Sequence, residues 1–270
     1  MKSVISFLAF FAALDCALGD NPPPPKSVST REFRRAFLDA GLIPDVMGSF
    51  NPTVSFYAGY QTRDGNKTLL SPGSKLNVME TKFPFEFSVE NIMNAQNATR
   101  NTRYILSMIG PDSPTREEPT ERSVLHYLAA NLTVEQTNSR ILSSALIMRN
   151  STPAFADYMT PDPKSGSGMH RYVYLLYVQP EKLNKMGFDA MGMDMNKRKN
   201  LSLLQFRKQC GLSRPIGGTF FMVDMGQNSD GGNGGNNGGG NGNGGNTGSI
   251  ATAGSIFMFV TLLATMFVWM

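Results

Sequence analysis

A run composed almost wholly of glycine and asparagine, from Asp230 to Thr247, limits what this chain can fold into. Such a run cannot bury enough apolar surface to offset its conformational entropy, so it behaves as a flexible tether. We therefore place a tether at 227–249 and expect the packed structure before it. About two hundred residues, 29–226, remain for one domain, which is enough for a hydrophobic core of ordinary size.

The segment from Ile256 to Met270 is apolar throughout and carries no charge. As a helix it would span roughly 22 Å, less than a hydrocarbon core of ~30 Å, and no Lys or Arg follows it. Small residues, a short spacer and an apolar tail are typical of a signal for a glycosylphosphatidylinositol (GPI) anchor, which we assign to 250–270. We expect attachment at Asn246, with Asn243 and a membrane span starting at Ile250 as the alternatives.

The other end of the chain has the pattern of a signal peptide. Lys2 precedes an apolar run from Val4 to Leu14, and small residues occupy positions 17 and 19. This run is too short for a membrane span of roughly 20 residues, which is the alternative. We therefore expect a signal peptide at 1–19 and a Pro-rich lead-in at 20–28. Together with the GPI signal, this predicts a secreted protein held at the cell surface, on the outer leaflet of the plasma membrane.

Acceptor sequences for N-glycosylation support export. Each tripeptide is weak evidence alone, but several in a chain with a signal peptide predict a glycoprotein. Pro153 makes the fourth acceptor the poorest of the set. The five acceptors are Asn66, Asn97, Asn131, Asn150 and Asn200.

Cysteine content and charge narrow the class of protein further. Cys16 leaves with the signal peptide, so Cys210 has no cysteine left for an intramolecular disulfide and the domain has no disulfide framework. The helical pattern around Cys210 favours a buried, inert thiol over intermolecular pairing. The net charge of +4, with 17% charged residues, is not that of a nucleic-acid-binding protein.

The pattern of the folded segment predicts a mainly β domain with a large antiparallel sheet and a few peripheral helices. Ser29 and Glu32 form a capping box for a helix that ends at Gly41. A last helix is expected at 201–209, ending at Gly211, and long loops are expected at 134–164. Short segments rich in β-branched and aromatic residues predict strands at Val54–Tyr57, Lys75–Val78, Arg103–Ile109, Val124–Leu132 and Arg171–Val178.

The chain has two histidines, and both lie at strand edges beside turn-forming residues. Strand alternation places His170 and Tyr172 on one face, with Arg171 on the other. Asp112, in a turn after a central strand, could accept a hydrogen bond from an imidazole and raise its pKa. Two imidazoles, a tyrosine hydroxyl and proline walls would make a small polar pocket for a phosphate or carboxylate group. The alternative is that each histidine is a structural residue.

These segments resemble the phosphatidylethanolamine-binding protein family. Its pattern Asp-Pro-Asp-x-Pro-Ser-Arg, then His-Trp, then Gly-x-His-Arg-Tyr, is followed in order over roughly 29–226. Gly110 stands where the first Asp of that pattern is usual, and the lead-in helix is similar to that of fungal members. With the signals at the two ends of the chain, the resemblance is to a secreted, GPI-anchored fungal-type member. The matching runs are Pro111-Asp112-Ser113-Pro114-Thr115-Arg116, His126-Tyr127 and Gly168-Met169-His170-Arg171-Tyr172.

The resemblance implies a β core with an anion pocket for phospholipid headgroups such as phosphoethanolamine. It also implies an alternative function, because some relatives inhibit serine carboxypeptidases. An enzyme is disfavoured, because no Gly-x-Ser-x-Gly elbow, reactive cysteine setting or metal-ligand spacing is present. No cofactor and no metal are expected. Carried over by position, the ligand-binding residues are Asp112, Pro114, His126, His170 and Tyr172.

Overall fold

The computed structural model describes residues 26–94, 101–186 and 196–225. The chain divides into two units, Met1–Ser229 and Asp230–Met270, and all described residues belong to the first. The expected signal peptide, tether, GPI signal and attachment residue Asn246 lie outside the described residues, as does Asn97. Within the described ranges, no helix is both long and apolar enough to cross a membrane.

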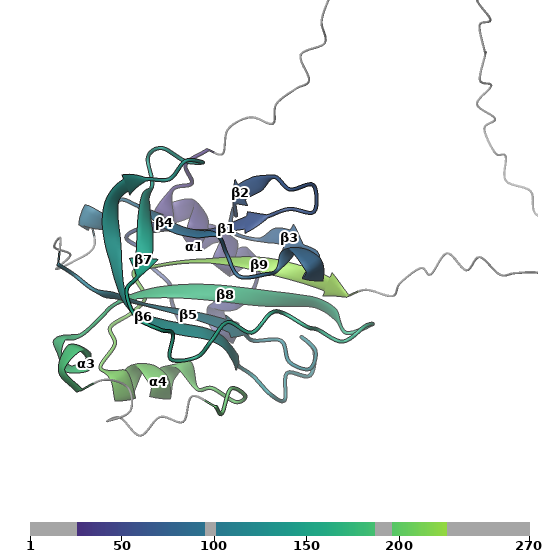
Figure 1. The fold of residues 1–270 in the computed structure, drawn as a ribbon. Coiled ribbons are helices and arrows are strands. Elements are labelled where there is room, and N and C mark those ends of the chain that lie inside the picture. The colour runs from purple at the N-terminus through teal and green to yellow at the C-terminus, as the bar shows by residue number, and fades with distance from the viewer. Residues whose placement is uncertain (1–25, 95–100, 187–195, 226–270) are drawn as a thin grey trace, which may run out of the picture. The chain divides into compact units, whose positions relative to one another are not determined.

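The described domain is built on one nine-stranded sheet with the order β2-β1-β4-β7-β6-β5-β8-β9-β3. Neighbouring strands are antiparallel, except that β3 pairs with β9 in parallel. The expectation of a mainly β domain with a large antiparallel sheet is confirmed (Figure 1). The strands are β1 (Ser55–Gln61), β2 (Lys67–Leu69), β3 (Ser74–Leu76), β4 (Glu86–Glu90), β5 (Tyr104–Gly110), β6 (Val124–Asn138), β7 (Leu146–Asn150), β8 (Gly168–Val178) and β9 (Gly217–Met225).

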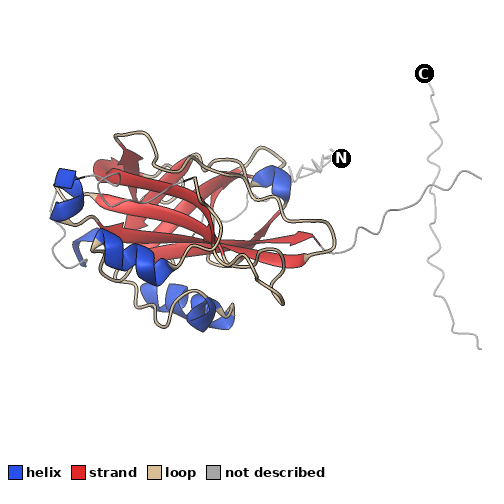
Figure 2. Cartoon of the chain, turned by 90° about the horizontal axis from the view of Figure 1, so that it is seen from below, coloured by secondary structure: helices blue, strands red, loops and turns tan. Residues whose placement is uncertain are grey.

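Apolar side chains cover both faces of the central strands, which is why β5 and β8 read as nearly continuous apolar runs. One core contains Tyr172 and Tyr174 of β8, and the other contains Val173. The second core also includes side chains from each α-helix of the described residues, so these helices cover that face (Figure 2). The helices are α1 (Thr30–Asp39), α2 (Leu42–Asp45), α3 (Glu181–Met186) and α4 (Leu203–Cys210), with 3-10 turns η1 (Val78–Glu80) and η2 (Ile92–Asn94).

The two main helices begin and end where local sequence signals place them. Ser29 and Glu32 form the expected capping box on α1, and Gly41 follows with φ of 70°. In α4 the hydroxyl of Ser202 accepts a hydrogen bond from the Gln205 amide, and Gly211 ends the helix at φ 66°. Cys210 is fully buried, so the expectation of a buried thiol is confirmed.

Two expectations about the sheet need correction. The region 134–164 does hold long loops, at 139–145 and 151–164, but it also contains the end of β6 and the whole of β7, which pairs with both β4 and β6. Strand β7 has a short apolar run, Leu146 to Met148, of which only Met148 is buried, and the strand pairs with a neighbour on each side. The expected strand at Lys75–Val78 ends at Leu76, because Asn77 caps the 3-10 turn that starts at Val78.

Candidate functional site

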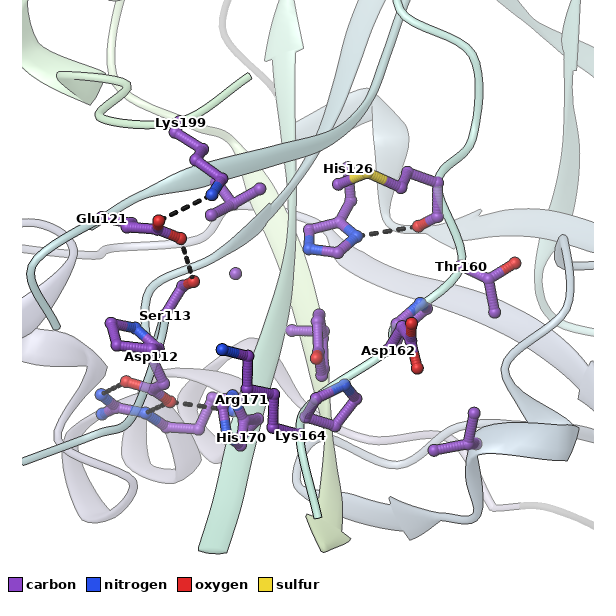
Figure 3. A pocket seen from close by; sticks show the side chains of 18 residues that line it. Asp112, Ser113, Glu121, His126, Thr160, Asp162, Lys164, His170, Arg171 and Lys199 are labelled. Carbon is purple, nitrogen blue, oxygen red and sulfur yellow. Dashed lines mark hydrogen bonds and ion pairs between the residues drawn. The ribbon is translucent and has the colours of Figure 1, made fainter. Parts of the chain in front are cut away.

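A cavity of about 670 Å³ opens where three central strands meet (Figure 3). Strand β5 ends at Gly110, which pairs with Val124 at the start of β6, while Ile109 pairs with Val173 of β8. The turn after β5 and the loop before β8 complete the walls. All five sequence-predicted residues line this cavity, namely Asp112, Pro114, His126, His170 and Tyr172.

His126 is held rigidly at the base of the cavity. Its Nδ1 lies 2.8 Å from the carbonyl oxygen of Met159, which can only accept, so Nδ1 carries the proton. The imidazole also packs edge-on against the ring of Tyr172, with centroids 5.0 Å apart. Burial lowers the pKa of His126 to about 4; the bond to Met159 opposes this shift, and Arg198 adds to it. The imidazole is therefore neutral at pH 7.

His170 is also neutral at pH 7. Its Nε2 lies 2.7 Å from Oγ of Ser167, whose own proton goes to the carbonyl of Lys164, 2.5 Å away. The imidazole is therefore the donor to Ser167. Burial lowers the pKa of His170, and the nearby carboxylate of Asp112 offsets only part of this.

The expectation that Asp112 accepts a hydrogen bond from an imidazole is wrong, although its charge does act to raise the pKa of His170 against the larger effect of burial. Asp112 is almost fully buried and accepts bonds from the backbone N, Nε and Nη2 of Arg171, at 2.9, 2.8 and 2.6 Å. Arg171 also reaches Asp45 of α2 at 2.9 Å and the carbonyl of Ala40 at 2.7 Å. Burial alone would lower the pKa of Arg171, but its bonds to Asp112 raise it overall. Asp112 thus supports the cavity wall and ties it to the N-terminal helices.

Tyr172 and Gly110 shape the space in front of His126. The ring of Tyr172 stacks on Phe221 at 5.3 Å, and burial raises the pKa of its hydroxyl. A Cβ added at Gly110 would lie 3.1 Å from Nε2 of His126 and 3.3 Å from Cε1 of Tyr172. Gly110 therefore leaves open the place where a side chain would cover both groups.

Charges of both signs stand at the rim of the cavity. On one wall, the Glu121 carboxylate accepts hydrogen bonds from Nζ of Lys199 at 2.6 Å and from the Ser113 hydroxyl at 2.8 Å. Asp162 lies on the opposite wall (Figure 3). Lys164 and Asp162 are exposed and make no ion pair within the described residues. Sequence reasoning missed these rim residues, although the spacing Asp162-x-Lys164 just before the glycine-rich turn was a usable signal.

The arrangement suits a small polar ligand with an anionic group. Neutral imidazoles form its base, and lysines and carboxylates at the rim could receive a zwitterion. Among the described residues, no three His, Cys, Asp or Glu side chains are grouped so that they could hold a metal ion.

The glycosylation acceptors differ in how free their side chains are. Asn66, Asn150 and Asn200 are exposed. Asn131 is half-buried; its Nδ2 donates to Oγ1 of Thr152 at 3.3 Å, and its Oδ1 accepts from Arg103 and Gln179. Glycosylation at Asn131 would therefore compete with these contacts.

Comparison with known proteins gives a family and a set of similar folds. A sequence model described as "PBP: Phosphatidylethanolamine-binding protein" matches residues 66–221. The chain is 30% identical over 128 residues to "Putative odorant-binding protein A5" of Drosophila melanogaster; the match covers 46% of this chain and about half, 54%, of that relative.

Two solved structures share the fold. One is the carboxypeptidase Y inhibitor complexed with its cognate proteinase, with a TM-score of 0.58, 21% identity, and coverage of 73% of this chain and 96% of that one. The other is a phosphatidylethanolamine-binding protein from Plasmodium vivax, with a TM-score of 0.50, 20% identity, and coverage of 74% and 97%.

Proposed function

The chain belongs to the phosphatidylethanolamine-binding protein family, and from that premise we propose that its cavity binds a phosphorylated headgroup such as phosphoethanolamine. The observation that carries this proposal is the convergence of His126, His170 and Tyr172 at the base of one cavity of about 670 Å³. The exposed ammonium of Lys164 could attract the phosphate, and the exposed carboxylate of Asp162 could attract an ammonium group.

We propose that this function is binding without catalysis. Ser167 touches an imidazole, but its proton is donated to the Lys164 carbonyl and the imidazole donates to it. This arrangement is the reverse of a serine activated by a base. Asp112, which could orient an imidazole, is bound to Arg171 instead. Both features support a binding site.

Calorimetric titration with phosphoethanolamine tests the proposal. We expect saturable binding to the wild-type protein and a loss of at least about tenfold in affinity in His170→Ala, because the substitution removes a polar side chain that lines the cavity and holds the Ser167 hydroxyl in place. Met93→Ala is the matched control, because Met93 is 77% exposed and does not line the cavity. Equal affinity in His170→Ala and wild type would contradict the proposal.

A second candidate function is inhibition of a serine carboxypeptidase, favoured by the similarity to the fold of the carboxypeptidase Y inhibitor. Such inhibition would need exposed contacts outside the cavity. A His126→Ala, His170→Ala double variant separates the two candidates. Headgroup binding would be lost in that variant, whereas inhibition through another surface would survive.

We also propose that the protein acts at the cell surface as a secreted, fungal-type, GPI-anchored glycoprotein. The apolar tail, the glycine- and asparagine-rich tether and the exposed acceptors support this location. Release of the protein from intact cells by a phosphatidylinositol-specific phospholipase C would support the anchor. Retention after that treatment, with extraction by detergent, would indicate a membrane span instead.

A further inference from the structure

We infer that the cavity selects a phosphate monoester that still carries one proton, because Gly110 leaves Nε2 of His126 open as a hydrogen-bond acceptor. This inference rests on the proposed function and specifies the ligand class of the same site. A sulfate ester or a phosphodiester has a similar tetrahedral group but no such proton. The cavity should therefore discriminate against both.

The imidazole of His126 is held in one orientation. The Met159 carbonyl accepts the Nδ1 proton at 2.8 Å, so the neutral ring has its lone pair on Nε2. Packing against Tyr172, with an interplanar angle of 90°, holds the ring in this position. Although only 6% of the His126 residue is exposed, the residue lines the cavity, so a ligand placed there can reach the lone pair of Nε2.

Position 110 has no side chain that could cover Nε2 of His126. A Cβ there would lie 3.1 Å from Nε2 and 3.3 Å from Cδ2 of His126. An aspartate, as in the family pattern, would put a carboxylate beside this ring and favour the charged imidazolium, which donates. With glycine, no carboxylate stands there, and the ring accepts.

The charges around the imidazole of His126 keep it neutral. Nη1 of Arg198 lies 3.3 Å from the His126 carbonyl, and its positive charge opposes protonation of the ring. Tyr172 of β8 is neutral at pH 7, and at the rim Lys199 is paired with Glu121. Lys164, Asp162 and the neutral His170 are the remaining titratable groups that face the cavity, besides the paired Asp112 and Arg171. Burial lowers the pKa of His126 to about 4, in agreement with this balance.

A phosphate monoester can supply the proton that Nε2 of His126 would accept. The second pKa of a phosphate monoester is about 6, so near pH 6 about half of it carries one O–H. That O–H can donate to Nε2, while the other oxygens accept from donors in the cavity. An oxygen without a proton would instead place a lone pair against a lone pair. An analogue without this proton leaves the buried Nε2 without a hydrogen-bond partner, and the free-energy cost of that loss makes the site discriminate strongly against it.

The test compares three ligands of one family by calorimetry on the full chain at pH 6. Phosphoethanolamine carries the proton, 2-aminoethyl sulfate lacks it, and glycerophosphoethanolamine stands for the diester of an intact lipid headgroup. We expect the sulfate and the diester to bind at least about tenfold more weakly than the monoester. Raising the pH to 8 should weaken binding of the monoester and leave the sulfate weak throughout.

Two variants test whether His126 is the residue that makes the cavity prefer phosphate to sulfate. His126→Gln can turn an amide N–H toward the ligand, so the phosphate-to-sulfate ratio should fall to within about threefold. Gly110→Ala is the matched steric control: it narrows the space but adds no donor, so affinity should fall while the ratio is kept. If His126→Gln does not fold, the wild-type ratio and its pH dependence remain decisive.

The outcomes separate this inference from the function on which it rests. Equal binding of phosphoethanolamine and 2-aminoethyl sulfate would overturn the inference and leave the proposed function standing. A preference for the sulfate or the diester would do the same. Absence of binding by all three ligands would overturn both.

Discussion

The buried, neutral His126 makes the stability of the domain depend on pH in a direction opposite to that of a salt-bridged histidine. Its pKa is about 4 in the folded protein, against 6.5 for an unperturbed imidazole. The unfolded chain therefore binds more protons between these values. The contribution to stability is fully present above pH 6.5 and is lost as the pH falls toward 4.

The size of the stability loss follows from the shift in the pKa of His126. Two and a half pKa units correspond to about 3 kcal/mol, of which about 2 kcal/mol should be lost between pH 7 and pH 4.5. Urea denaturation of wild type and His126→Gln over this range isolates the effect, because other titrating groups are common to both chains and cancel in the difference. The stability difference should shrink as the pH falls. A difference that does not change with pH would refute the argument, as would a measured His126 pKa near 6.5 by proton NMR.

Three other predictions follow from contacts elsewhere in the domain. Replacing Asp112 with alanine should lower the free energy of unfolding by about 3–5 kcal/mol, because the fully buried Arg171 loses its main partner; urea denaturation measures this, and a loss below 1 kcal/mol would contradict it. The Cys210 thiol, whose pKa burial raises to about 11, should react with iodoacetamide at pH 8 only after denaturation, and rapid labelling of the native protein would count against its burial. Glycan occupancy at Asn131 should be lower than at Asn66, by peptide mass spectrometry, and equal occupancy would show that its contacts with Thr152 and Gln179 do not restrict the acceptor.

Features set by local sequence were predictable. The capping box at Ser29 and the glycines after both helices act within a few residues of the chain, so their signals survive in any fold. The apolar runs of β5 and β8 were equally clear, because strands buried on both faces need apolar side chains throughout. The two histidine segments identified the cavity, since they lie near the starts of β6 and β8, the two strands that flank β5.

Features set by distant contacts were not predictable. Strand β7 pairs with β4 and β6 on its two sides, whereas its own sequence offers only the short apolar run Leu146 to Met148 inside a polar stretch. The partner of Asp112 was also misassigned. Sequence alone showed a carboxylate near His170 and Arg171, but strand alternation and the position of the turn direct it to the guanidinium. The sign of both histidine pKa shifts then depends on burial, which only the packed structure gives.

The central claim is that a phosphate group binds in the cavity between β5, β6 and β8. A crystal structure of the protein with phosphoethanolamine tests it most directly. We predict the phosphate within hydrogen-bond distance of His126 Nε2, above Gly110, with the ammonium group toward Asp162. Density for the ligand at another surface, or an unchanged cavity at saturating ligand, would contradict the account.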